Sequence, residues 1–360
     1  MLNFTVGPVM EYERTKKIAG ENSPYFRTKE FSEINLESEK LLKSLLKADD
    51  DCKCVFLTGS GTFGLECAIV NIVKNNDYVL TVNGGSFGQR FVNILNLYGV
   101  KNDDIKLEFG SQLKEEVLNK YAGKGYTVFC VNMDETSSGI LYDMPLISKF
   151  CKENGIVLIV DAISAFICDD VKMSEWGIDC VITASQKAVA IQSGMSTLTL
   201  SQRALERVYS SENSINHSLY MDMKYALENQ KRGQPSYTPC VSTFIQFNDR
   251  LKMLSETNNG EKFIETERKI IEKHANEIRS YIDGVSHYHF VAEDKSNCVT
   301  AVRTDKNNAV EIFETLKDKY NIWICPNGGE YAKSIFRIGH VGNITDDDNK
   351  ALLKALKEIE

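Results

Sequence analysis

The stretch from about residue 52 to residue 200 restricts the fold more than any other part of the chain. Short apolar runs alternate there with amphipathic segments, a pattern typical of a sheet built from strand and helix units. The runs predict buried strands at residues 55–57, 79–82, 128–131, 156–160 and 180–183. We therefore expect an α/β fold.

The pattern changes after about residue 240. Long amphipathic segments predict helices, and short apolar runs between them predict strands. The helices are expected at 265–282, 309–320 and 346–359, and the strands at 298–302 and 334–338. We expect a large domain over residues 1–240 and a smaller C-terminal α+β domain over residues 241–360, which a chain of 360 residues can accommodate.

Polar and small residues follow the predicted strands of the first half. They occur directly after each strand, where open α/β sheets bind their ligands. We therefore expect one crevice built by loops at residues 58–62, 83–87, 132–139, 161 and 185–187.

The charge balance favours a small-molecule partner. The chain has 42 basic and 50 acidic residues without a long run of one sign, so we expect no nucleic acid or membrane partner.

The N-terminus lacks the pattern of a signal peptide, and no apolar run is long enough to cross a bilayer, which predicts a cytoplasmic protein. The 10 cysteines and 5 histidines show no zinc-binding spacing, so we expect no metal site.

Residues 59–62, with the sequence Gly-Ser-Gly-Thr, lie between a predicted strand and a predicted helix. Backbone amides at such a helix start, with the hydroxyls of Ser60 and Thr62, can bind a phosphate. Gly59, Gly61 and Gly64 also fit the dinucleotide pattern GxGxxG, which leaves an NAD-dependent oxidoreductase as an alternative. The next strand, however, ends in Asn83 and not in the acid that would hold a ribose.

Asp161 and Lys187 each follow a predicted strand of the same sheet. A carboxylate at the end of a buried strand needs a cation or hydrogen bonds, and a helix cap would supply the simplest structural explanation. Lys187 precedes an apolar stretch, which is unusual for a surface lysine, and a neutral amine there could form a Schiff base. A phosphate loop, an acid for a pyridine nitrogen and an amine together fit pyridoxal 5'-phosphate.

Several motifs resemble those of class V aminotransferases of fold type I, the group that contains alanine–glyoxylate, serine–pyruvate and 2-aminoethylphosphonate–pyruvate transaminases. Residues 160–164 resemble the VDAxS segment, residues 185–188 the SQK segment and residues 135–139 the ESSTG loop. The resemblance covers nearly the whole chain. It implies a mostly parallel sheet sandwiched by helices, pyridoxal phosphate as cofactor, and a homodimer with a shared active site.

The resemblance also implies roles for individual residues. Lys187 would hold the cofactor as a Schiff base and move a proton, and Asp161 would keep the pyridine nitrogen protonated. Phe87 would stack on the ring, and Thr238, beside Tyr237, would reach the phosphate in the partner subunit. The predicted cofactor-binding residues are Ser60, Gly61, Thr62, Phe87, Thr136, Asp161, Ser164, Gln186, Lys187 and Thr238, and the predicted substrate-binding residues are Gly7, Arg27 and Arg337.

The expected activity is transfer of an amino group from a small amino donor to a 2-oxo acid, pyruvate or glyoxylate, in the manner of an alanine/serine–glyoxylate transaminase. A 2-aminoethylphosphonate–pyruvate transaminase is the first alternative, because an arginine can bind either a carboxylate or a phosphonate. A cysteine desulfurase with Cys325 as nucleophile is a second. A binding protein without activity is a third.

Overall fold

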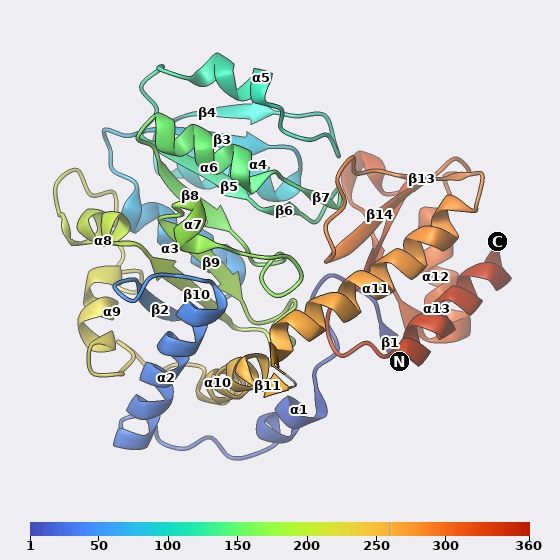
Figure 1. Cartoon of the computed structure of the whole chain (residues 1–360), viewed down its shortest axis with the longest axis horizontal. Helices are drawn as coiled ribbons and strands as arrows, with labels where there is room; N and C mark the ends of the chain where they lie inside the picture. Colours follow the sequence, from blue (N-terminus) through green and yellow to red (C-terminus); the bar gives the residue numbers. More distant parts are fainter. Residues whose placement is uncertain (259) are drawn as a thin grey trace.

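The computed structural model describes residues 1–258 and 260–360, and a seven-stranded sheet lies at its centre (Figure 1). The strand order is β2-β10-β9-β8-β5-β3-β4. Strand β10 runs antiparallel to both of its neighbours, and all other neighbours in the sheet are parallel. The bounds are β2 Lys53–Thr58, β3 Tyr78–Asn83, β4 Lys101–Lys106, β5 Val128–Asn132, β8 Val157–Asp161, β9 Cys180–Ala184 and β10 Met195–Leu200. The predicted α/β class with a mostly parallel sheet is confirmed.

Helices cover both faces of this sheet (Figure 1). Alternate residues of β8 therefore enter different cores: Leu158 and Val160 belong to one, Val157 and Ile159 to the other. This double burial explains why the strand is a continuous apolar run in the sequence. One face is covered by α2 Lys29–Leu45, α6 Met144–Glu153 and α10 Val241–Ser255, and the other by α3 Gly61–Ile72, α4 Ser86–Leu97, α8 Gln202–Tyr209 and α9 Met223–Gln230.

A smaller antiparallel sheet forms the C-terminal part, with the order β13-β14-β17-β16. Helices pack on it and enclose a third core, which Phe4 of the N-terminal segment also enters. The strands are β13 Tyr288–Phe290, β14 Val299–Thr304, β16 Cys325–Pro326 and β17 Ile335–Gly339, and the helices are α11 Phe263–Asp283, α12 Ala309–Tyr320 and α13 Asp346–Ile359.

Helix α11 connects the two parts of the molecule (Figure 1). Its Ile264 and Ile271 belong to a core of the central sheet, whereas Ile278 and Ile282 belong to the third core. Helix α10 packs against α2, on the side of the central sheet. The division at residue 240 stays a prediction, and we propose that the small domain begins within α11.

The remaining elements are short. Strand β1 (Leu2–Asn3) pairs with β15 (Ile322–Trp323), β6 (Asp134–Glu135) with β7 (Ile140–Leu141), and β11 (Thr257–Asn258) with β12 (Glu261–Lys262). The other helices are α1 Glu13–Ala19, α5 Glu115–Leu118, η1 Asn119–Tyr121, α7 Met173–Trp176 and η2 Gly329–Tyr331.

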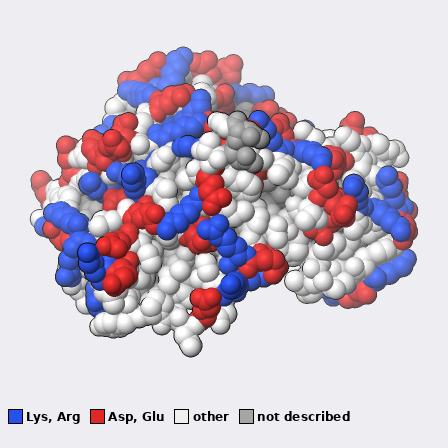
Figure 2. All heavy atoms as spheres, turned by 60° about the horizontal axis from the view of Figure 1, so that its bottom comes forward, with Lys and Arg blue, Asp and Glu red and all other residues white. Residues whose placement is uncertain are grey.

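Acidic and basic side chains are intermixed on the face of the molecule in Figure 2, and neither sign forms a continuous stripe there. Within the described part of the chain, none of the helices has the length and apolar character that crossing a membrane requires.

Candidate active site

Segments that follow strands β3, β5 and β9 bring Phe87, Thr136 and Lys187 together. Lys187 Nζ donates a hydrogen bond to Thr136 Oγ1 at 3.3 Å, and it lies 4.8 Å from the centroid of the Phe87 ring. Only 8% of Lys187 is exposed. The crevice predicted at the carboxyl ends of the strands therefore contains a buried amine beside an aromatic ring.

Glu135 fixes the position of Phe87. The carboxylate of Glu135 is fully buried, and its Oε2 accepts hydrogen bonds from the backbone N–H groups of Phe87 at 3.0 Å and Gly88 at 2.9 Å. These amides belong to the first turn of α4, where the helix dipole favours a negative charge. Ser137 Oγ and Asn132 Nδ2 also donate to this carboxylate. We had not predicted Glu135, because its partners lie about 50 positions away in the sequence.

Asp161 lies at the end of β8 and is 6% exposed. Burial raises the pKa of its carboxyl to about 6, against the opposing effects of the Ile163 N–H and the Lys187 charge. The Ile163 N–H donates to Oδ1 at 2.8 Å. A buried carboxylate of this kind is stabilised when a cation, such as a protonated ring nitrogen, binds beside it.

The start of α3 has the form of an anion-binding turn. Ser60 is the N-cap residue, yet its side chain makes no capping hydrogen bond, so its hydroxyl and the first-turn amides are available to a ligand. A Cβ at Gly61 would lie 2.5 Å from Ile163 Cδ1, so a larger residue there would have to displace the end of that side chain. Arg90, which we had not predicted, donates to Thr62 Oγ1 at 3.1 Å and stacks on the Phe87 ring.

Arg337 on β17 faces the same crevice from the small sheet. Its Nη1 donates to the Thr136 carbonyl at 3.1 Å and its Nη2 to the Pro326 carbonyl at 3.0 Å. Its Nε is buried and has no hydrogen-bond partner among the described residues. Burial lowers the pKa of the guanidinium. Arg337 lines a cleft together with Phe87, Ser137, Asn327 and Tyr331.

The other predicted site residues fall into two groups: Gly7, Gln186 and Ser164 lie beside residues of the crevice, whereas Arg27 and Thr238 do not line its cleft. Gly7 lies against the lysine, since a Cβ there would be 3.2 Å from Lys187 Cγ, and Gln186 Oε1 is buried without a partner among the described residues. Ser164 Oγ donates to the Asp134 carbonyl at 3.3 Å. Arg27 instead donates to the carbonyls of residues 235 and 236, and neither Arg27 nor Thr238 lines the cleft of Arg337.

A model of the family described as aminotransferase class-V matches residues 6–340 of the chain. The chain belongs to the class-V aminotransferase family. The match covers both the central sheet and the C-terminal sheet, so the resemblance noted in the sequence motifs is confirmed along nearly the whole chain.

Individual relatives agree with this assignment. This class-V aminotransferase is 29% identical to an uncharacterized aminotransferase of Methanocaldococcus jannaschii. The alignment spans 343 residues and covers 92% of this chain and 86% of the relative. It is 25% identical to a serine–glyoxylate aminotransferase of Hyphomicrobium methylovorum, over 89% of this chain and 80% of the relative. The structure of an alanine–glyoxylate aminotransferase from Nostoc sp. superposes with a TM-score of 0.91, covering 99% of this chain and 94% of that one, at 20% identity.

Membership of the family implies pyridoxal phosphate, so the chain is a pyridoxal-phosphate-dependent aminotransferase. The residues of the crevice fit this cofactor: a helix start without a side-chain cap for the phosphate, a buried acid for the ring nitrogen, and a buried amine. The oxidoreductase alternative is wrong, because its glycines form this same helix start in a class-V aminotransferase. Within residues 1–258 and 260–360, no group of three or more His, Cys, Asp or Glu side chains is arranged to hold a metal ion.

Proposed function

We propose that this class-V aminotransferase moves an amino group from a small amino acid, such as alanine or serine, to pyruvate or glyoxylate. The observation that carries the proposal is the half-buried Arg337, whose guanidinium donates hydrogen bonds only to backbone carbonyls among the described residues and whose Nε is buried without a partner there. Thr136 connects it to Lys187, because its carbonyl accepts from the arginine and its hydroxyl accepts from the lysine. A substrate carboxylate on Arg337 would thus lie near the amine.

The chain's own residues divide the chemistry among them. Bound pyridoxal phosphate supplies an aldehyde that condenses with amines and a ring that withdraws electrons from the substrate carbon. Lys187 Nζ would accept the proton from the amine-bearing carbon of the substrate and deliver it to the carbon of the cofactor that carried the aldehyde. Asp161 would hold a proton on the ring nitrogen, and Phe87, fixed through Glu135, would orient the ring plane.

A donor screen tests the proposal. Alanine, serine and 2-aminoethylphosphonate are offered separately to the loaded enzyme, and the loss of the cofactor's visible absorbance is followed in a single turnover. We expect alanine or serine to react faster than the phosphonate, as the similarity to a serine–glyoxylate aminotransferase suggests. Faster reaction with 2-aminoethylphosphonate would overturn the carboxylate assignment in favour of the phosphonate alternative, and sulfide release from cysteine would favour the desulfurase.

Replacement of Arg337 by lysine is expected to raise KM for the carboxylate substrate by about 10- to 100-fold, with a smaller effect on kcat. Lysine keeps the charge but loses the fork that can hold two carboxylate oxygens together. Steady-state kinetics at saturating acceptor measure the effect. Arg14→Lys, at a surface ion pair with Asp249, serves as the matched control. An unchanged KM in the Arg337 variant would show that the anion binds elsewhere.

We also propose that two copies of the chain form a homodimer through the surface around Thr238. Thr238 is exposed, Tyr237 beside it stacks on Tyr220 at 5.4 Å between ring centroids, and Leu219 is 75% exposed. An exposed apolar group of this kind is typical of an interface. It would allow Thr238 to reach the phosphate site of the other copy.

Light scattering during size-exclusion chromatography tests the dimer. We expect Leu219→Asp to halve the molar mass, since it places a charge on the apolar surface. Val310→Asp, at another exposed apolar residue on α12, should leave the mass unchanged. A wild-type chain that elutes as a monomer would contradict the proposal.

A further inference from the structure

The segment that follows Lys187 is a turn in an unusual conformation. The Ala190 N–H donates to the Lys187 carbonyl at 2.8 Å, and the Ile191 N–H donates to the Ser185 carbonyl at 3.3 Å. Ala190 has a φ of +57°, in the left-handed region that residues other than glycine rarely adopt. A strained backbone of this kind persists only where the surrounding structure holds it. The turn beside the lysine therefore needs support from another part of the molecule.

Helix α10 supplies that support through two fully buried side chains, Gln246 and Arg250, which lie one helical turn apart on the same face. The Oε1 atom of Gln246 accepts from the Gln192 N–H at 3.3 Å, and its Nε2 donates to the side-chain oxygen of Gln192 at 3.3 Å. Arg250 Nε donates to the Val189 carbonyl at 3.0 Å. The helix thus holds the backbone on both sides of Ala190.

The charge of Arg250 is balanced by buried groups. Both carboxylate oxygens of Glu267 on α11 accept from Arg250 Nη2, Oε2 at 2.6 Å. Tyr12, just before α1, donates its hydroxyl to Glu267 Oε1 at 3.0 Å, and its ring centroid lies 4.4 Å from the guanidinium carbon. Desolvation of both charges offsets much of what a buried ion pair contributes to stability. The pair does, however, fix the direction of the Nε–H group that donates to Val189.

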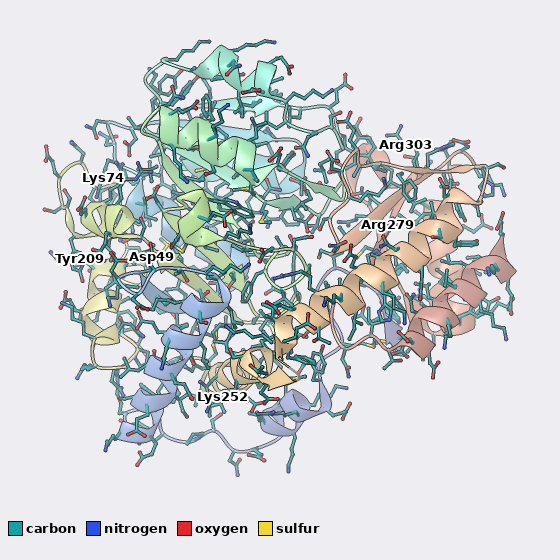
Figure 3. All side chains as sticks on the ribbon, in the orientation of Figure 1. Asp49, Lys74, Tyr209, Lys252, Arg279 and Arg303 are labelled. Carbon is teal, nitrogen blue, oxygen red and sulfur yellow. The ribbon has the colours of Figure 1, made fainter. Side chains whose placement is uncertain are left out.

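Other side chains of α10 hold the helix to its neighbour α2. Asn248 is 5% exposed, and its Nδ2 donates to Ser38 Oγ at 3.0 Å. Lys252, labelled in Figure 3, pairs with Glu37 at 2.7 Å. Both partners belong to α2. The same helix therefore offers variants that weaken its packing on α2, for comparison with variants at the lysine turn.

We propose that Gln246 and Arg250 are positioning residues for Lys187: through the turn that follows the lysine, α10 keeps the amine in its place beside the Phe87 ring. Without these hydrogen bonds the turn relaxes from the left-handed conformation of Ala190, and the amine samples other positions. A displacement of about 1 Å at a reacting group can lower a rate by about 10²-fold. This inference rests on the proposed role of Lys187 and adds the residues that make its position exact.

Arg250→Lys and Gln246→Met test the proposal in the full chain. Lysine keeps the charge that pairs with Glu267 but lacks the Nε–H group, and methionine has nearly the shape of glutamine without its polar atoms. We expect each variant to bind pyridoxal phosphate about 3- to 10-fold more weakly, measured from the cofactor's visible absorbance in a titration without amino donor. We also expect kcat to fall by about 10-fold. KM for the donor should change by less than about twofold, because Arg337 bonds to other segments.

Two variants on the same helix are the matched controls. Asn248→Leu removes a buried polar side chain that faces α2, so it should lower Tm about as much as Gln246→Met does and leave cofactor binding and kcat unchanged. Lys252→Ala, at a half-exposed ion pair, should leave Tm, cofactor binding and kcat unchanged.

Undiminished cofactor binding in Gln246→Met would overturn the inference. So would an equal loss in Asn248→Leu, because a loosened helix would then account for the effect. If Arg250→Lys fails to fold, Gln246→Met still carries the test, since it leaves the ion pair of Arg250 intact. The titration uses no amino donor, so its result stands apart from that of the donor screen. Weaker cofactor binding in a chain that rejects alanine and serine would refute the proposed donors and leave the role of α10 intact.

Discussion

Replacing Lys187 by alanine is expected to abolish covalent capture of pyridoxal phosphate and to slow amino transfer by at least about 10³-fold. In the proposed function this side chain supplies both the nucleophile that binds the aldehyde and the base that moves the proton, and it is the amine beside Phe87 and Thr136. The loaded enzyme is reduced with borohydride and digested, and mass spectrometry locates the pyridoxyl group. We expect the label on residue 187 in the wild type and no label in the variant.

Two controls separate this chemistry from a general loss of structure. Lys187→Arg keeps a positive charge in the crevice but cannot form the covalent bond, so it should behave like the alanine variant. Lys350→Ala, on the exposed side of α13, should retain the label and the activity. Turnover at the wild-type rate in Lys187→Ala, or a label on another lysine, would refute the assignment.

Asp161→Asn is expected to lower kcat by about 10²- to 10³-fold, the effect of removing a preorganised charge from a buried site. Asparagine has the same shape, and its side-chain oxygen can still accept from the Ile163 N–H. It cannot, however, stabilise a proton on the ring nitrogen, so the ring would withdraw electrons less strongly. Single-turnover rates with a saturating donor measure the chemical step, and Asp347→Asn, at an exposed acid of α13, serves as the control. A loss below about threefold would mean that another group holds that proton.

Much of the fold could be predicted because its strands and helices are strongly patterned. The helices predicted at 309–320 and 346–359 have the same bounds in the structure, where each packs one apolar face on the third core. Strand β4 was missed because it lies at the edge of the sheet and most of its side chains are charged. Ile105 is the one buried residue of this strand. Strand β10 was missed because it lies between β2 and β9 and runs antiparallel to both. An alternation of strands and helices does not predict an antiparallel strand at that place.

The candidate site could be predicted where residues lie at the ends of strands. Lys187, Thr136, Phe87 and Asp161 meet because parallel strands place their carboxyl ends at one edge. The roles of Arg27 and Thr238 stay predictions, and the role of Thr238 depends on a second copy of the chain.

The residues that support this site could not be predicted. Glu135 acts through amides of α4, and Arg90 through a side chain on the preceding helix. These contacts are formed only when distant segments fold together, and the spacing of residues along the chain does not show them.

The hydrogen bonds of Arg337 have a consequence for how tightly a substrate is held. One donor goes to the Thr136 carbonyl beside the central sheet, and the other goes to the Pro326 carbonyl in the C-terminal sheet. Because Arg337 itself belongs to the C-terminal sheet, an incoming anion that takes over the Nη1 donor also removes a bond at the seam between the two halves. The measured affinity then includes the free energy of loosening that seam, so substitutions at the seam can change substrate binding without contacting the substrate.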